Sequence, residues 1–235
     1  MRKEPEPVRR WTWPHYYTTS WLSGLFMKIM GGFKVRGRDH LPRKGGALIC
    51  ANHVSYLDPP ALGAGVLPRR TYYFAKKELF RNPLFGYFLT KHYAFPVDRG
   101  AVDREAIRHA IDVLKQGEFL VLFPEGGRSP DGTLQPGNIG PALIASKAGV
   151  PIIPAALKET DKILPLHGGV HRGHVQLDFG EPIDISAYGS DRLTKEQMQE
   201  ITEKLMSAIY ELQKIQYERV GQTAPPRVKE KADAE

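Results

Sequence analysis

The residues that decide the fold are 45–60, which read GGALICANHVSYLDPP. Two glycines open a short apolar run, Ala47–Ala51, whose length and composition are typical of a buried strand. The chain then passes through polar residues to Asp58 and Pro59, the combination of an N-cap and a first-turn proline. The stretch therefore predicts a strand, a tight turn and a helix start, with His53 at the carboxyl end of the strand.

Strands and helices alternate outward from this stretch. Further strands are predicted over residues 71–75, 93–97, 119–123, 150–157 and 175–179. Helices are predicted over residues 103–115 and 139–147. This alternation predicts an α/β fold with a mixed, largely parallel sheet flanked by helices. We expect one catalytic domain over residues 34–192.

The two ends of the chain have different characters. Residues 1–10 are charged and contain two prolines, which predicts disorder. Residues 11–33 predict an amphipathic, membrane-associating helix, which Gly31-Gly32 should end or bend. Its apolar face is predicted to hold Trp21, Leu22, Leu25, Phe26, Ile29, Met30 and Phe33. No apolar run reaches the ~20 residues that span a bilayer.

At the other end, Thr194 and Gln197 have the spacing of a capping box. They predict a C-terminal helix over residues 193–220 that packs on the domain. Residues 221–235 contain two adjacent prolines and a charged end, so we expect a flexible tail.

The composition favours an anionic partner. The formal net charge is +7 and the pI is about 9.4, which suits nucleic acid, an anionic membrane or a phosphate-bearing substrate. The aromatic residues gather in the N-terminal stripe and do not alternate with basic residues, which disfavours nucleic acid. The single cysteine, Cys50, lies within an apolar run and is predicted to be a buried small hydrophobe.

His53 and Asp58 are the first candidate catalytic residues. Five residues apart, they do not share a face of a regular helix, but the predicted turn brings them together at the sheet edge where α/β proteins bind ligands. Asp58 would then accept a hydrogen bond from one imidazole nitrogen and leave the other as a general base. The alternative is a capping aspartate beside a surface histidine.

Two further segments follow apolar strands. Residues 123–129 read FPEGGRS, in which Glu125, Gly126, Gly127 and Arg128 could approach and bind an anion. Residues 95–100 read FPVDRG and deliver Arg99. The alternative for each segment is an ordinary turn.

The sequence contains no Gly-x-Ser-x-Gly elbow, metal-ligand spacing or Walker-type phosphate loop. A general base without a protein nucleophile indicates direct transfer, in which the hydroxyl of an acceptor is the nucleophile.

These motifs, in this order, resemble the glycerolipid acyltransferase family, in particular the 1-acyl-sn-glycerol-3-phosphate (lysophosphatidic acid) acyltransferases. The resemblance runs from about residue 33 to 182 and also includes Val150-Pro151-Ile152-Ile153-Pro154. Gly127 stands where the family usually has threonine.

The resemblance implies transfer of a fatty acyl group from acyl-CoA or acyl carrier protein to a lysophospholipid in phospholipid biosynthesis. It implies no metal and no cofactor besides the acyl donor. His53 would be the base, Asp58 its orienting partner, and Arg99, Glu125 and Arg128, with the two glycines, the acceptor phosphate site. We expect a peripheral or monotopic enzyme on the cytoplasmic face of an anionic membrane.

Two alternatives remain open at this point. One is an acyltransferase of the same fold that uses another lysolipid acceptor, which Gly127 keeps open. The other is a non-catalytic module that binds membrane surfaces, against which the intact His53 and Asp58 pair speaks.

Overall fold

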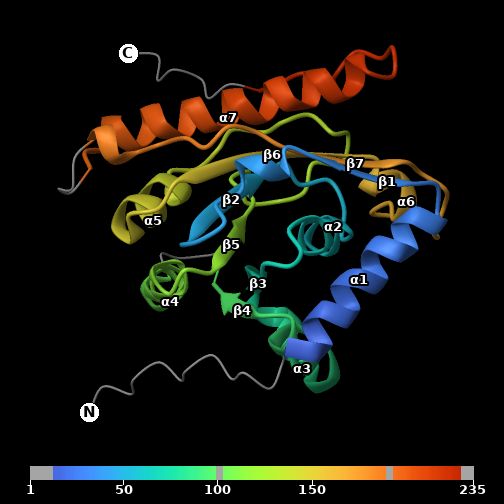
Figure 1. The fold of residues 1–235 in the computed structure, drawn as a ribbon, viewed down its shortest axis with the longest axis horizontal. Coiled ribbons are helices and arrows are strands. Elements are labelled where there is room, and N and C mark those ends of the chain that lie inside the picture. The colour runs from blue at the N-terminus through green and yellow to red at the C-terminus, as the bar shows by residue number, and fades with distance from the viewer. Residues whose placement is uncertain (1–12, 99–102, 189–192, 229–235) are drawn as a thin grey trace.

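The computed structural model describes residues 13–98, 103–188 and 193–228, which form one seven-stranded sheet in the order β1-β7-β6-β2-β5-β3-β4 (Figure 1). The strands are β1 Phe33–Arg36, β2 Ala47–Ala51, β3 Thr71–Lys76, β4 Ala94–Val97, β5 Phe119–Leu122, β6 Ile152–Lys158 and β7 Val175–Phe179. Neighbouring strands are parallel apart from the antiparallel pair β6 and β7. The predicted mixed, largely parallel sheet is confirmed.

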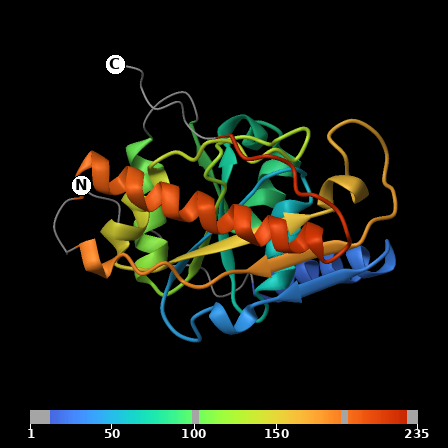
Figure 2. The same ribbon diagram turned by 90° about the horizontal axis from the view of Figure 1, so that it is seen from above.

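Helices cover both faces of the sheet. They are α1 Trp13–Ile29, α2 Asp58–Gly65, α3 Pro83–Lys91, α4 Arg104–Lys115, α5 Gly140–Ala148, α6 Thr160–Ile163 and α7 Lys195–Glu218, with 3-10 turns η2 Arg38–His40, η3 Lys77–Phe80 and η4 Ser186–Tyr188. α1 and α2 lie on one face, whereas α4, α5 and α7 lie on the other (Figure 1). Seen from above, α7 runs across the sheet (Figure 2).

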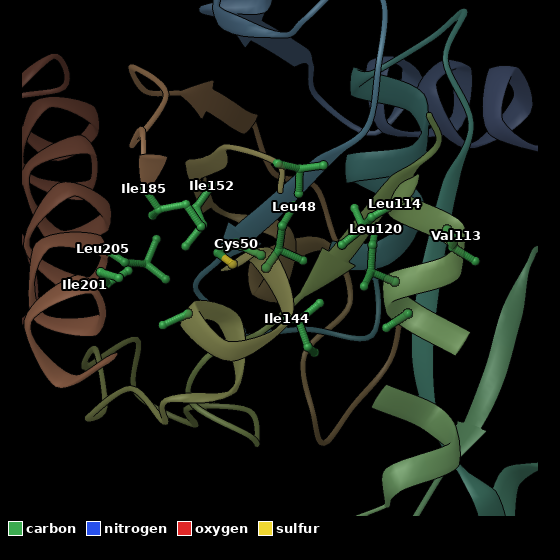
Figure 3. Close-up of a cluster of buried hydrophobic side chains, with 14 of the residues drawn as sticks. Leu48, Cys50, Val113, Leu114, Leu120, Ile144, Ile152, Ile185, Ile201 and Leu205 are labelled. Carbon is green, nitrogen blue, oxygen red and sulfur yellow. The ribbon is translucent and has the colours of Figure 1, made fainter. Parts of the chain in front are cut away.

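The alternation of side chains along β2 divides the core into two parts. Leu48 and Cys50 pack with side chains of α4, α5 and α7 (Figure 3), whereas Ile49 packs toward α2. All three side chains are fully buried. Burial raises the pKa of the Cys50 thiol, which confirms the expected role of this residue as a small hydrophobe.

The N-terminal helix packs on the domain through one face only. Tyr16 and Met27 are buried, and a Cβ at Gly24 would lie 3.3 Å from the Cβ of Ala64 in α2. The opposite face is exposed and carries Trp21, Leu22, Leu25, Phe26 and Ile29. No helix among the described residues is long and apolar enough to span a bilayer.

The predicted apolar face was too long by two residues. α1 ends at Ile29, before Gly31 and Gly32, which both have positive φ. Met30 and Phe33 therefore leave the helical face, and both pack partly buried against the core.

The C-terminal helix begins as expected. The Thr194 side chain accepts from the Gln197 backbone N–H, and the Gln197 side chain accepts from the Thr194 N–H. The first part of the expected tail is bound to the domain, since Leu134 exchanges backbone hydrogen bonds with Pro226 and Val228. The predictions for residues 1–10 and 229–235 lie outside the described residues.

Candidate active site

His53 and Asp58 meet at the carboxyl end of β2, as their spacing predicted. His53 Nδ1 lies 2.7 Å from Asp58 Oδ2. Asp58 is fully buried and His53 is 8% exposed. No described residue forms a hydrogen bond with His53 Nε2, so this nitrogen is free to act on a ligand.

The Asp58 carboxylate is held by the turn that precedes it. Its Oδ2 also accepts the backbone N–H groups of Val54 and Ser55, at 2.7 and 2.8 Å. The prediction that Asp58 is the N-cap of the helix was wrong, because Leu57 is the N-cap and Asp58 is the first helical residue. The carboxylate turns back to the loop instead of capping its own helix, which fixes its position beside His53.

Thr160 is a contributor that the sequence reasoning missed. Its hydroxyl donates to Asp58 Oδ1 at 2.5 Å, and the side chain is fully buried. Thr160 begins α6 directly after Glu159, which has φ 65. The Glu159 carboxylate is bound by Lys158, Lys162 and the His174 N–H, so this unusual turn is fixed by local contacts. Both oxygens of Asp58 are thereby satisfied.

The loop after β5 holds the main chain of His53 from both sides. The His53 N–H donates to Glu125 Oε1 at 2.8 Å, and the Ser129 N–H donates to the His53 carbonyl at 2.7 Å. The Phe123 ring stacks on the imidazole with centroids 3.9 Å apart. β2 and β5 are parallel neighbours, which explains why two motifs about 70 residues apart meet at one edge.

Glu125 also holds a second part of the main chain. Its second oxygen accepts the Gln135 N–H at 2.9 Å, so both carboxylate oxygens bind protein main chain. Burial, with a smaller contribution from Asp58, raises the pKa of Glu125 to about 7 despite the two N–H donors. These contacts make Glu125 a residue that positions the loop, and its contact with a substrate stays a prediction.

Arg128 offers an unused donor next to the turn between His53 and Asp58. Its guanidinium carbon lies 3.7 Å from the centre of the Tyr56 ring, a contact that orients the planar group. Its buried Nη1 has no hydrogen-bond partner among the described residues. A buried, unpaired cationic N–H is costly, so this group is suited to an anionic ligand.

The two glycines leave space beside this arginine. Gly126 has φ 74, a conformation that favours glycine, and a Cβ at Gly127 would meet nothing within 4 Å. A ligand can therefore approach the backbone here. The expected role of Arg99 lies outside the described residues.

Comparisons of the chain with a family model, with curated proteins and with a solved structure all find acyltransferases. The family model described as Acyltransferase matches residues 32–158. The 1-acyl-sn-glycerol-3-phosphate acyltransferase of Bacillus subtilis is 34% identical, covering 80% of this chain and 92% of that protein. The protein of the same name from Streptococcus pneumoniae is also 34% identical, over 69% of this chain and 60% of its own length. The crystal structure of the 1-acyl-sn-glycerophosphate (LPA) acyltransferase PlsC from Thermotoga maritima superposes with a TM-score of 0.70 at 25% identity, covering 90% of this chain and 84% of that chain.

Proposed function

The chain belongs to the acyltransferase family, and we propose that it transfers a fatty acyl group to the free hydroxyl of 1-acyl-sn-glycerol-3-phosphate, giving phosphatidic acid. It is a 1-acylglycerol-3-phosphate O-acyltransferase of phospholipid biosynthesis. The donor is an acyl thioester on coenzyme A or acyl carrier protein. The observation that carries the mechanism is the buried pair His53 and Asp58 with its free Nε2.

Four steps account for the chemistry. His53 Nε2 takes the proton of the acceptor hydroxyl as its oxygen attacks the thioester carbonyl. The new carbon–oxygen bond forms, the carbon–sulfur bond breaks, and the imidazolium returns the proton to the leaving thiolate. Asp58 accepts from Nδ1 throughout, which holds the tautomer and stabilises the imidazolium. A positioned general base contributes ~10²–10⁴-fold to such a step.

Arg128 supplies the binding energy for the acceptor phosphate. Its buried Nη1 has no partner among the described residues, and the two glycines of the same loop leave the backbone open to a ligand. Because Ser129 of this loop holds the His53 carbonyl, a phosphate bound at Arg128 places the acceptor at a defined distance from the base. Orientation of this kind lowers the entropy cost of the reaction.

The exposed face of α1 supports a membrane location for the enzyme. Its large apolar side chains lie opposite the face that packs on α2, and Lys28 of the same helix and Lys34 of β1 are exposed. A helix of this composition binds the interface of an anionic bilayer without crossing it. We infer a peripheral or monotopic enzyme on the cytoplasmic face, where its acceptor lies in the bilayer.

A direct assay tests the proposal. Purified protein is incubated with labelled acyl-CoA or acyl carrier protein and 1-acyl-sn-glycerol-3-phosphate, and phosphatidic acid is separated and counted. The wild type should form it, and His53→Ala should lower kcat by at least ~10²-fold with an unchanged circular dichroism spectrum. Equal turnover by a folded His53→Ala variant would exclude His53 as the base. Transfer to other lysolipids only would exclude the acceptor.

A further inference from the structure

The helix α3 presents large apolar side chains to solvent. Leu84 is 80% exposed and Tyr87 is 63% exposed. Leu79 of η3, and Phe85 and Phe88 of α3, are each exposed by 40% or more. We call these five side chains the α3 surface. A large apolar patch on the solvent-exposed surface of a folded protein generally marks an interaction site.

The packing of the other side of α3 on the domain explains why these five side chains are exposed to solvent. Gly86 is buried, and a Cβ there would lie 3.0 Å from the Phe80 carbonyl oxygen. Leu89 packs partly buried against the core one turn later. Leu84, Tyr87 and Phe88 share the opposite face of the helix, since positions three and four apart align. The packing of α3 on the domain therefore does not use these exposed side chains.

The α3 surface adjoins the first turns of α1. His92, which follows α3, lies with Nε2 2.7 Å from Thr19 Oγ1 in α1. Its ring also contacts those of His15 and Phe88, with centroids 5.2 and 4.0 Å apart. Figure 1 shows the first turns of α1 beside α3. The two helices are thus in contact near the start of α1.

The charge of both segments suits an anionic partner. The sequence has no Asp or Glu over residues 13–36 or over residues 79–97. These segments carry cations that include Lys28, Lys34, Arg81 and Lys91, and the Lys91 ammonium lies 5.1 Å from the centre of the Tyr87 ring. Aromatic rings beside lysine and arginine are typical of the lipid headgroup region.

We propose that the α3 surface is a second bilayer-contacting element, which inserts Leu84, Tyr87 and their neighbours into an anionic phospholipid membrane together with α1. The proposal rests on the membrane location inferred above and extends it to a part of the chain 50 residues beyond α1. Two helices that contact the interface at different points fix the tilt of the domain, which one helix cannot do.

Vesicle binding tests the α3 surface directly. The full chain is floated with phosphatidylcholine vesicles containing roughly one third phosphatidylglycerol, as wild type, as Leu84→Glu/Tyr87→Glu and as the matched control Ile215→Glu. Ile215 is an exposed apolar residue of α7. The α3 double variant should bind at least ~10²-fold more weakly, since each apolar side chain removed from an interface costs roughly ten-fold or more. The control should bind as wild type.

A labelling experiment avoids dependence on the charged variants. The single cysteine, Cys50, is fully buried, so Leu84→Cys and the control Ile215→Cys can each be labelled selectively with an environment-sensitive fluorophore. Lipids that carry a quencher in their acyl chains should quench the label of Leu84→Cys and leave that of Ile215→Cys unchanged. Equal quenching of the two labels, or wild-type binding by the α3 double variant, would overturn the proposal.

Two further results separate this proposal from its alternatives. If the wild type is a dimer in solution and the α3 double variant is a monomer, a second copy of the chain covers this surface and the proposal fails. Activity on a short-chain acceptor in detergent should be unchanged in the double variant, and its loss would also overturn a membrane role. Should the wild type bind vesicles through α3 but form no phosphatidic acid, the proposed function fails and the α3 surface stands.

Discussion

Replacing Asp58 with asparagine removes a charge from the site and keeps the shape of the side chain. Three donors converge on Oδ2, namely the Val54 and Ser55 N–H groups and His53 Nδ1, all within 2.8 Å. The other oxygen accepts from Thr160. The asparagine amide NH2 cannot face three donors, so the amide oxygen takes the place of Oδ2 and the NH2 group faces the Thr160 oxygen.

This orientation decides the size of the effect. His53 Nδ1–H keeps an acceptor, so the tautomer is preserved and only the charge that stabilises the imidazolium is lost. A hydrogen bond to a charged group is worth ~1.5–3 kcal/mol, and ~1.4 kcal/mol is a factor of ten in rate. Asp58→Asn should therefore lower kcat by roughly 10- to 10²-fold. A wrong tautomer would cost ~10⁴-fold, as in the serine proteases.

Steady-state kinetics distinguishes the two cases. Asp58 is fully buried, so KM for donor and acceptor should stay within about two-fold of wild type, below the ~1.4 kcal/mol of a ten-fold change. Circular dichroism checks the fold. A loss near 10⁴-fold would mean that the amide is inverted despite the two backbone donors. A loss under about three-fold, less than 1 kcal/mol, would mean that the carboxylate charge plays no part.

Three other substitutions test the remaining contacts. Thr160→Val leaves an oxygen of a buried carboxylate unpaired and should lower both the free energy of unfolding, by ~1–3 kcal/mol, and kcat without changing KM, as measured by urea denaturation and kinetics. Thr160→Ser should restore both, and a failure of serine to do so would refute the hydroxyl's role. Burial raises the pKa of Glu125 from 4.5 to about 7, so its contribution to stability is complete below pH 4.5 and is lost as the pH rises through 7. As the pH rises over this range, the free energy of unfolding of Glu125→Gln should therefore increase relative to that of wild type by up to about 3 kcal/mol, at ~1.4 kcal/mol per pKa unit. A difference in unfolding free energy that does not change with pH in urea titrations would contradict this expectation. Arg128→Ala should raise the acceptor KM by about ten-fold or more and leave the donor KM unchanged, whereas the exposed control Arg108→Ala should change neither. Equal effects on both substrates would indicate a structural role.

Local signals in the sequence predicted most of the fold. The buried strand over residues 47–51, the helix after Asp103 and the capping box of Thr194 and Gln197 each depend on residues a few positions apart. The meeting of His53 and Asp58 was also predictable, because a strand end and a helix start separated by one turn leave few other arrangements. Their catalytic roles are predictions that the kinetics above would test.

What the sequence did not reveal depends on long-range pairing. β1 is only four residues long and pairs with β7, about 140 residues later, so its pattern is lost beside the apolar helix before it. Thr160 reaches Asp58 across 102 residues, and no local pattern marks such a contact. α3 had a signal, since Asn82 and Pro83 are a cap and a first-turn proline, but the apolar residues after them have no polar face to define a period.

The close packing of α1 on α2 has a consequence for how turnover depends on the amount of substrate. Gly24 of α1 lies against Ala64 of α2, and α2 begins with Asp58, so a single stiff unit joins the residues that we propose to face lipid to the proposed catalytic pair. The fold then fixes the distance of this pair from a bilayer to which α1 is bound. With the membrane location proposed above, acceptors reach this pair by lateral diffusion in two dimensions, and we expect the rate to follow their mole fraction in the membrane. Diluting the acceptor with inert lipid slows the enzyme, while adding more vesicles of the same composition to already bound enzyme does not change its rate.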